Sequence, residues 1–588
     1  MMRPPNQWAA RPWAYVSIFA AWFASVLWFH PRLIALLDMA KGPVAHGAVL
    51  FFVVFTEVAW LYGFYNVGVV LFAIWYRRSQ PAAAPVVTSP RVMETPVALL
   101  YVTCNDFVEE SAASCLAQDY PSFTLYLLDD SSDSATKARI DQFAERDPRI
   151  RVVRRPDRRG FKAGNLNHGL TTVAMEPLFV IADADEILPT DFLRRMVPRL
   201  MSDPSCGFVQ ANHRCNPAGR GTLKAAVGVG IDIHWRWYHP LRNRFGFVML
   251  LGHGAIIRHD VWESIGGFPE IVSEDLAFSL RAREQGWHGV FAEDVVCLEE
   301  FPETMRAFRV RHMKWTRGTC EFFAKEMWPA LRSPNIPVVE KLDVLFPALS
   351  LPLALVYFLF VIDANVLFTL LFTHPQPLTL VLAGRELVVP VRALDAGFSV
   401  VNTWDFFLIT LLTFLSPILC FIIDLWRQPK ALLRFLCQSS VIYAALGPMS
   451  SLGVLGYLIT RKATFLVTGD KSAGQTVVPS QSTWVRRTWN WVRRAITGSH
   501  PDHPLVQAFE VTCGIGFAAM CLQMMQVSFL GLAIGITLMP ILHHVPWNNA
   551  TIQRVIYLPF SLMVGGLMLG GLGLLGMQPV FFGYGFHF

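Results

Sequence analysis

The segment LFVIADADE, residues 178–186, decides the expected fold, because a short apolar run passes directly into three carboxylates. Two similar runs precede it: VALLYVT at 97–103, and TLYLL at 124–128, which leads into Asp129 and Asp130. Helical stretches separate the three runs. Continuous apolar strands that alternate with helices are typical of a buried parallel sheet with helices on both faces. Because ligands bind at the carboxyl ends of such strands, the sequence predicts a site at these acidic strand ends.

The composition places this sheet within a strongly apolar chain. Of the 588 residues, 53% are hydrophobic and only 16% are charged, against roughly 25% charged residues in an average soluble domain. This excludes a purely soluble enzyme, a disordered chain and a nucleic-acid binder, and the net charge of +6 is too diffuse for DNA. The ten cysteines show no CxxC pair and no zinc spacing, so we expect isolated thiols in a reducing compartment.

Long apolar runs lie on both sides of the sheet-forming stretch. Two precede it, at 13–29 and 47–76, and each is long enough to cross about 30 Å of hydrocarbon. Others follow it, at about 344–374, 404–427, 431–460, 506–542 and 555–583. The predicted organisation is two N-terminal transmembrane helices at 1–76, a cytosolic domain with interfacial helices at 77–340, a transmembrane region at 341–460, a cytosolic segment at 461–505 and C-terminal transmembrane helices at 506–588.

Basic residues set the expected orientation. Arg3 and Arg11 precede the first apolar run. Arg77 and Arg78 close the second run, so both ends of this pair are expected in the cytosol. The first run has no clear small-residue cleavage site, and we therefore interpret it as an anchor and not as a signal peptide.

Three later segments have their own patterns. Residues 375–403 contain LTLVL and ELVVPV around Gly384, which predicts a small hairpin on the far side of the membrane. Basic residues on both sides of 431–460 exclude a single crossing there, leaving an interfacial or re-entrant segment or a tight pair of short spans. The total is six to eight spans. WVRRTWNWVRR, at 484–494, alternates Trp with Arg pairs, as a helix in the headgroup layer does.

The Asp-x-Asp after residues 178–182 is the first candidate for chemistry. In an extended Asp-x-Asp both carboxylates point the same way, and a hard divalent cation takes oxygen ligands. Mg²⁺ or Mn²⁺ held by Asp183 and Asp185 would neutralise a diphosphate leaving group. Acidic residues at strand ends are also common in turns, so the second acidic strand end at Asp129 and Asp130 strengthens the interpretation.

Three further segments each allow a structural and a functional interpretation. RRGFKAGNLN, at 158–167, is either a solvated basic loop or a phosphate-binding loop in which Lys162 supplies a point charge. In SED, Asp275 either caps a helix or acts as a general base. In RVRHMKWTRG, Trp315 is either an interface anchor or a stacking platform for a sugar ring, and Lys314 and Arg317 flank it.

Together these residues resemble the membrane-embedded family-2 glycosyltransferases, which include bacterial cellulose synthase, hyaluronan synthase and β-glucan synthases. The resemblance covers about residues 97–325, and its motifs follow the family's order: VTCND, LLDDSSD, FKAGNLN, DADE, GFVQANHRCNP and SED. It implies a polytopic α-helical membrane protein with an inserted cytosolic α/β domain of the glycosyltransferase-A fold. It also implies a hexosyltransferase that uses a UDP-sugar and Mg²⁺ or Mn²⁺.

The resemblance also implies the site residues. Asp275 is expected as the catalytic base, with Glu274 beside it, and Asp183 and Asp185 as the metal ligands. Nucleotide-binding positions are Thr103, Asp106, Asp129, Asp130, Lys162, Asp183, Lys314 and Arg317. Acceptor-binding positions are Gln210, His213, Gly252, His253 and Trp315. FLVTGDK, at 465–471, resembles the cytosolic gating loop of cellulose synthase and adds Thr468 and Lys471, although the spacing to the lysine is one residue longer here.

Two departures from the family separate this chain from cellulose synthase. Processive members carry Gln-x-x-Arg-Trp, whereas residues 311–315 read Arg-His-Met-Lys-Trp. The Phe-Phe-Cys-Gly-Ser segment is replaced by MLLGHG at 249–254. We therefore do not expect cellulose as the product, and activation by a cyclic dinucleotide is not expected because no domain for it follows the gating loop.

The function expected from the sequence is an inverting, processive transferase that extends a β-glucan from UDP-glucose and secretes it through its own helices. The linkage stays open. Two alternatives remain: transfer of a single sugar to a lipid carrier, and a transporter with a nucleotide-sensing domain that uses intramembrane charges such as Glu57, Asp363, Asp424 and Glu510. The expected partners are the UDP-sugar, a glucan acceptor, the lipid bilayer and accessory secretion subunits, with no nucleic acid. The oligomeric state stays open, and the expected location is the bacterial inner membrane.

Overall fold

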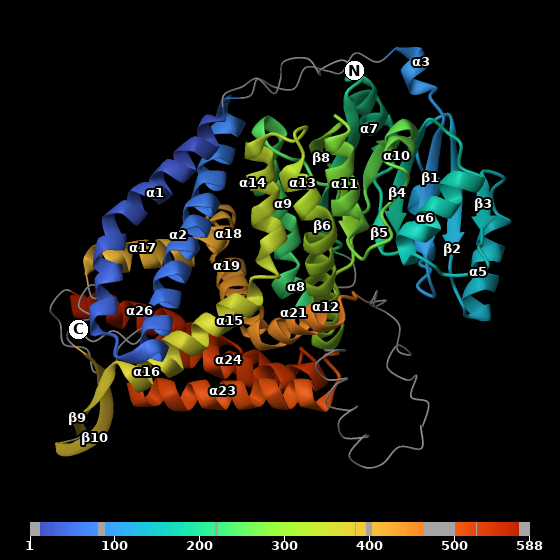
Figure 1. Ribbon diagram of the computed structural model, residues 1–588. Helices are drawn as coiled ribbons and strands as arrows, with labels where there is room; N and C mark the ends of the chain where they lie inside the picture. Colours follow the sequence, from blue (N-terminus) through green and yellow to red (C-terminus); the bar gives the residue numbers. More distant parts are fainter. Residues whose placement is uncertain are drawn as a thin grey trace.

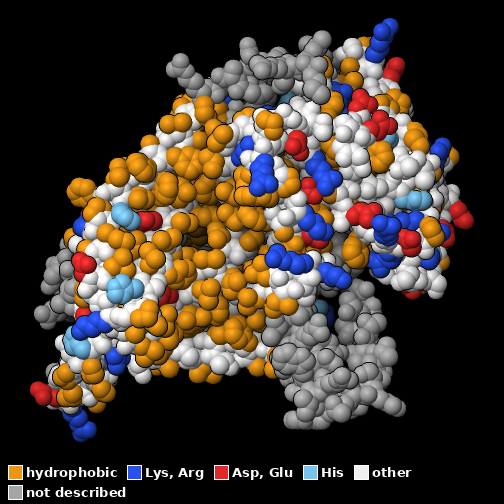
Figure 2. Space-filling view, viewed as in Figure 1, with side chains coloured by type: hydrophobic (Ala, Val, Ile, Leu, Met, Phe, Trp, Pro, Cys, Tyr) orange, Lys and Arg blue, Asp and Glu red, His pale blue; other side chains and the backbone are white. Residues whose placement is uncertain are grey.

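A computed structural model describes residues 12–79, 89–217, 222–382, 384–395, 403–463, 500–524 and 526–574. An α/β domain with one large sheet lies at one end, and long apolar helices form the rest (Figure 1). In the space-filling view, hydrophobic side chains cover most of the helical part of this face, whereas charged side chains gather over the α/β domain (Figure 2). The two regions therefore present different surfaces to their surroundings.

The sheet has eight strands in the order β3-β2-β1-β4-β7-β6-β8-β5. The three predicted strands are confirmed as β1 (Val97–Thr103), β2 (Phe123–Asp129) and β4 (Leu178–Asp183), all parallel. The other strands are β3 (Ile150–Val153), β5 (Glu186–Ile187), β6 (Cys206–Cys215), β7 (Ala255–Arg258) and β8 (His288–Glu299).

The sheet is parallel among the strands predicted from the sequence and mixed beyond them. β7 runs antiparallel to both β4 and β6, and β5 antiparallel to β8, whereas β6 and β8 are parallel. Between β6 and β7 the chain passes through α8 (Thr222–Val227) and α9 (Val229–Phe245).

Helices cover both faces of the sheet, as predicted. On one face, Leu99 and Tyr101 pack with α4 (Glu109–Leu116), α5 (Ser134–Ala144) and α7 (Phe192–Met201). On the other face, Ala98 and Leu100 pack with α6 (Phe161–Thr172) and α11 (Glu274–Glu284). Successive residues of β1 thus enter opposite cores, which follows from the two-residue repeat of a strand. Every side chain of this run except Val102 is buried, and this explains its continuous apolar character.

Eight helical segments among the described residues are long and apolar enough to span a membrane. They are 13–39, 42–79, 354–371, 404–425, 429–460, 504–524, 527–544 and 550–569. The predicted run at 506–542 is in fact two helices, α23 (Pro504–Met524) and α24 (Val527–His544). The fold class expected from the sequence, a polytopic helical membrane protein with an inserted α/β domain, is confirmed.

The segment at 429–460 is a series of short helices and not one straight rod. It consists of α19 (Pro429–Phe435), a π-helical turn, α20 (Val441–Ala445) and α21 (Gly447–Thr460). The predicted hairpin is confirmed as antiparallel β9 (Thr373–Leu382) and β10 (Arg385–Leu394), and it projects from the end of the molecule opposite the sheet (Figure 1).

Four helices correspond to those predicted from the sequence to be interfacial, between the sheet domain and the membrane helices. These are α9, α12 (Met305–Phe322), α13 (Trp328–Arg332) and α14 (Val338–Ser350). Arg242 of α9 lies 3.1 Å from Asp343 of α14, and both side chains are almost fully buried. Tyr65 of α2 (Gly42–Ser79) donates a 2.5 Å hydrogen bond to the same carboxylate. This buried group therefore fixes an N-terminal membrane helix to the interfacial layer.

Replacing Asp343 by Ala should destabilise the protein strongly, because it leaves the Arg242 guanidinium buried without its counter-charge. Breaking such a pair costs about 3–5 kcal/mol. The matched control is Glu109→Ala, which removes the exposed Arg146–Glu109 pair and should change stability by less than about 1 kcal/mol. Thermal unfolding of the detergent-purified variants measures both effects, and equal shifts would contradict the role of Asp343.

Candidate active site

Three neighbouring parallel strands end at the same edge of the sheet and bring the first predicted residues together. Thr103 is in register with Asp129 across β1 and β2, and Val102 with Asp183 across β1 and β4. Asp106 accepts hydrogen bonds from Thr103 Oγ1 at 2.9 Å and from the Cys104 amide at 2.6 Å. Burial raises the pKa of the Asp106 carboxyl. The sequence therefore correctly places these groups at one edge.

Both carboxylates after β2 are paired with arginines that sequence reasoning missed. Asp129 accepts from Arg154 Nε at 2.7 Å, and Asp130 binds Arg155 at 2.8 and 2.6 Å in a two-point contact. Arg155 also donates to the carbonyl of Phe161, at the start of α6. The basic loop is therefore held in shape by ion pairs, and the two consecutive arginines after β3 were the available signal.

Lys162 lies in the first turn of α6 and joins four elements. Its Nζ lies 2.5 Å from Asp183 Oδ1 at the end of β4 and 3.8 Å from Glu274 at the start of α11. It also donates a 3.0 Å hydrogen bond to the carbonyl of Gly252. Burial alone would lower the pKa of Lys162, but Asp183 and Glu274 together raise it above its usual value. The ammonium is thus a fixed positive charge within the acidic cluster.

The Asp-x-Asp motif stands at the end of β4, although not in the extended form expected. Asp183 is the last residue of the strand, whereas Ala184 and Asp185 form a turn before β5. Partial removal of water by the surrounding protein, and then the neighbouring Asp183, raise the pKa of Asp185 to about 6. The side chain of Asp183 is 29% exposed and Asp185 is exposed, so the two carboxylates offer accessible oxygen donors of the kind that a hard divalent cation binds. The residues present therefore fit such a cation.

Glu274 and Asp275 open α11 beside Lys162. Asp275 Oδ1 accepts from the Leu276 amide at 2.8 Å, which is the contact of a carboxylate at a helix start. Burial raises the pKa of both carboxyls, that of Glu274 to about 7. A Cβ atom on Gly252 would lie 3.1 Å from Asp275 Oδ2, so the backbone of Gly252 closely approaches this carboxylate.

Three predicted acceptor residues form one contiguous cluster. Gln210 Oε1 accepts from the Leu251 amide at 2.8 Å, and its Nε2 donates to the carbonyl of His253 at 2.9 Å. The His213 and His253 rings stack, with centroids 4.3 Å apart. Two carboxylates that sequence reasoning missed, Glu186 and Glu299, lie within 3.1–3.7 Å of both imidazoles.

Helix α12 carries the last predicted residues. Trp315 is 43% exposed, and the Arg311 guanidinium lies 4.7 Å from its ring centre. Burial lowers the pKa of Lys314, which interacts electrostatically with Asp183 and Glu274. Arg317 is buried and interacts with Cys320 of the same helix. Thr468 and Lys471 of the predicted gating loop lie outside the described residues, as does the segment at 484–494.

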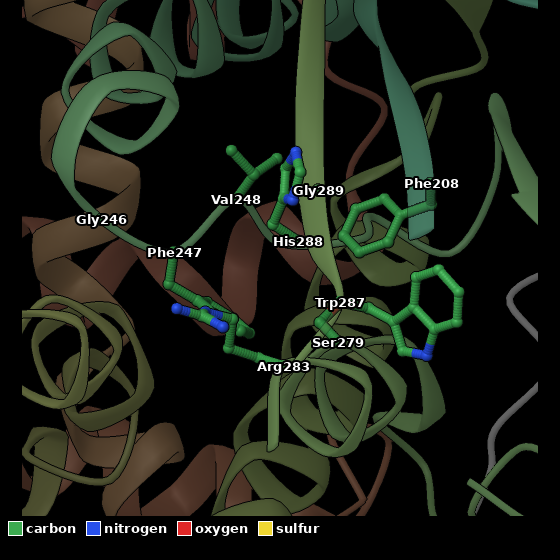
Figure 3. A pocket seen from close by; sticks show the side chains of 9 residues that line it. All are labelled: Phe208, Gly246, Phe247, Val248, Ser279, Arg283, Trp287, His288 and Gly289. Carbon is green, nitrogen blue, oxygen red and sulfur yellow. The ribbon is translucent and has the colours of Figure 1, made fainter. Parts of the chain in front are cut away.

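A small cavity of about 10 Å³ is a separate feature (Figure 3). It is lined by Phe208 from the beginning of β6, Gly289 from the beginning of β8 and Arg283 from α11. His213 and Glu299 lie near the other ends of these two parallel strands. The cavity has room for about one water molecule, and it is not part of the carboxylate site.

Comparison with known proteins identifies the domain. Residues 100–318 match the family model Glycosyltransferase like family 2. This part of the chain is a family-2 glycosyltransferase-like domain, and the expected resemblance is confirmed.

Among curated relatives, a probable glucomannan 4-beta-mannosyltransferase 6 from Oryza sativa subsp. japonica is 28% identical over 37% of this chain and 39% of its own length. A probable glucomannan 4-beta-mannosyltransferase 1 from Arabidopsis thaliana is 25% identical over 57% of this chain and 63% of its own length. The chain thus spans less than two thirds of either relative.

Among solved structures, the mannosyltransferase PcManGT from Pyrobaculum calidifontis, in complex with GDP-Man and Mn²⁺, is 22% identical to this chain. The match has a TM-score of 0.40 and covers 53% of this chain and 86% of the PcManGT chain.

Gly254 should not tolerate a side chain, because it lies between two groups of the histidine cluster. A Cβ atom there would stand 2.5 Å from Glu186 Oε1 and 2.5 Å from His213 Nε2, and its φ is +59°. Gly254→Ala should cost roughly 1 kcal/mol of backbone strain and about 1–3 kcal/mol of overpacking. The control is Gly266→Ala, at φ +76° in open space, which should show only the strain. Thermal unfolding compares them, and equal stability would contradict the tight packing.

Proposed function

We propose that this chain is an inverting membrane glycosyltransferase that extends a β-linked polysaccharide from a nucleotide-activated hexose. The observation that carries the proposal is the position of Lys162, in contact with both the end of β4 and the start of α11. It brings Asp183 of the Asp-x-Asp next to the Glu274–Asp275 pair. A glycosyl transfer needs these two features together: a place for a diphosphate and a base for the acceptor.

The donor half of the site is proposed at the carboxyl ends of β1, β2 and β4. Thr103, Asp106 and Asp130 would contact the nucleoside. Asp183 and Asp185 would hold Mg²⁺ or Mn²⁺, which when bound neutralises charge on the diphosphate. Lys162 and Lys314 add positive charge at the same place, and their contribution grows as the diphosphate leaves.

The acceptor half is proposed around Asp275. Its carboxylate takes the proton from an acceptor hydroxyl, and the hydroxyl oxygen forms a bond to the anomeric carbon while the bond to the diphosphate breaks. Attack from the face opposite the leaving group inverts the configuration. The exposed Trp315 offers one ring face for stacking a sugar, because Arg311 lies over the ring.

The donor proposed first is UDP-glucose, which would give a β-glucan. A mannosyl donor such as GDP-mannose is the second candidate, because the relatives described above are named as mannosyltransferases. Processive extension and secretion are favoured by the many membrane helices that follow the domain. Transfer of a single sugar to a lipid carrier is the alternative within this class.

The location proposed is a bacterial inner membrane with the α/β domain in the cytosol. Arg77 and Arg78 close α2, and Arg77 pairs with Glu293 of β8 in the sheet domain, which fits the excess of basic residues in cytosolic loops. The proposed partners are the lipid bilayer, a glycan acceptor and accessory secretion subunits.

Purified protein should release nucleoside diphosphate from one member of a panel of UDP-glucose, GDP-glucose and GDP-mannose, in the presence of Mn²⁺ or Mg²⁺. Asp275→Asn should lower turnover about 10²–10⁴-fold, because it removes the base, and should keep nucleotide affinity. Gel filtration and linkage analysis of the product distinguish a polymer from a single sugar on lipid. Absence of turnover with the whole panel would refute the proposed function, and full activity of Asp275→Asn would refute the base.

The pH profile should show an acid limb above the range of an ordinary aspartate. The base works only when deprotonated, so kcat/KM falls as the pH drops through the pKa of the Glu274–Asp275 pair, which burial raises above the usual value of about 4. Lys162 counteracts this effect, so Lys162→Gln should move the limb to higher pH in the residual activity. A limb at pH 4 or below, or one that Lys162→Gln leaves in place, would contradict the assignment.

A further inference from the structure

Four side chains close to the proposed acceptor site form a box that the mechanism above does not use. His213 Nδ1 lies 3.4 Å from Glu299 and its Nε2 lies 3.7 Å from Glu186. His253 makes the same two approaches with its nitrogens exchanged, at 3.5 and 3.1 Å. The two stacked imidazoles therefore each bridge the same pair of carboxylates.

We propose that Glu299 binds hydroxyl groups of the acceptor's terminal sugar, and that the stacked histidines and Glu186 hold it in the position that selects the reacting hydroxyl. This inference rests on the proposed glycosyl transfer and names a further acceptor-binding residue for it. The ligand class is a pyranose with neighbouring hydroxyls, since a carboxylate can accept two hydrogen bonds from such a pair.

The two carboxylates of the box differ in a way that assigns their roles. The side chain of Glu186 is fully buried, whereas that of Glu299 keeps 16% of its exposure. Glu299 also interacts electrostatically with Asp185 and with Arg311 of α12. It is therefore the open member of the box, and it lies within electrostatic reach of both the Asp-x-Asp and the helix that carries Trp315.

The box is connected to the proposed base through four residues of backbone. Two hydrogen bonds hold the ends of the segment at 251–254. The Leu251 amide donates to Gln210, and the Gly254 amide donates to Glu186 Oε2 at 3.1 Å. Between these anchors, the carbonyl of Gly252 binds Lys162, and its α-carbon approaches Asp275. The distance between Glu299 and Asp275 is thus set by rigid contacts, which is what selection of one hydroxyl requires.

A metal ion is the competing explanation for the same residues, because Glu186, His213 and His253 offer ligand atoms within 4.8 Å of one another. The ring planes, however, differ by only 13° and are stacked. The lone pair of an imidazole lies in its ring plane, so the lone pairs of two stacked rings lie in separate, nearly parallel planes. A tetrahedral ion needs converging lone pairs, and the geometry favours hydrogen-bonded ion pairs.

The test is a kinetic comparison of Glu299→Gln and Glu299→Asp with the wild-type protein. The acceptors are cellohexaose and laminarihexaose with a glucosyl donor, or mannohexaose with GDP-mannose, according to the donor that the wild type turns over. Loss of one charge-assisted hydrogen bond should raise the acceptor KM at least about tenfold and leave the donor KM within twofold. Glu299→Asp keeps the charge but shortens its reach, so we expect a second linkage in its product.

The matched control is Glu293→Gln on the same strand, where the carboxylate pairs with Arg77 at 3.2 Å; its acceptor KM should stay within twofold of the wild type. Equal changes in the donor and acceptor KM for Glu299→Gln would overturn the inference, as would an unchanged acceptor KM. The inference would also be overturned if the purified wild-type protein contained one equivalent of zinc and the His213→Ala variant contained none. Absence of turnover in the wild type would instead refute the proposed function, so the two failures are distinguishable.

Discussion

The contact between Lys162 and Asp183 is the constraint on which the rest of the site depends. Asp183, Asp185, Glu274 and Asp275 lie near one another, and like charges in one site destabilise one another. The ammonium of Lys162 offsets this repulsion and also binds the carbonyl of Gly252. One side chain thereby fixes the relative positions of β4, α6, α11 and the loop at 251–254, and the chemistry of the site uses all four.

The parts of this arrangement that could be predicted are those encoded locally. The strands at 97–103, 124–128 and 178–182 are recognisable because most of their side chains are buried on both faces, so that every position except Thr103 and Thr124 is apolar. The hairpin is recognisable because Gly384 stands between two β-rich runs. Lys162, Asp183 and Asp275 carry recognisable motifs, but the contact of Lys162 with Glu274, more than a hundred residues further along the chain, could not be predicted from spacing.

The parts that could not be predicted depend on pairings between distant segments. The direction of β7 is set by the path through the interfacial helices, which no local pattern records. Glu299 ends a strand without any motif, and the structure alone shows that its carboxylate lies beside two histidines. Arg154 and Arg155 carry no motif, and only the structure shows that they pair with Asp129 and Asp130. In each case the ion pair or hydrogen bond that a polar residue makes depends on a partner far away in the sequence.

The membrane charges support a transferase more than a transporter. Glu510 pairs with Arg309 of α12 at 2.5 Å with both side chains fully buried, Asp424 pairs with Arg236 of α9, and Glu57 lies 2.8 Å from His30. Two of these three pairs fasten interfacial helices to membrane helices. The helix that carries Lys314 and Trp315 is therefore anchored to α23 by the Arg309–Glu510 pair. These buried charges have a structural role in holding helices together. Asp363 differs from these three, because it is buried and neither of its carboxylate oxygens has a hydrogen-bond partner among the described residues.

The two departures from the family's motifs meet in space. Arg311 stands where processive members carry Gln, and His253 lies in the segment that replaces Phe-Phe-Cys-Gly-Ser. Both interact with the carboxylate of Glu299. An acceptor-binding surface made only of neutral groups would not need a carboxylate at this position. A carboxylate that is largely buried here needs cationic neighbours to remain charged. The two departures therefore both lie beside the carboxylate that we propose as an acceptor-binding group, although they come from different elements of the fold.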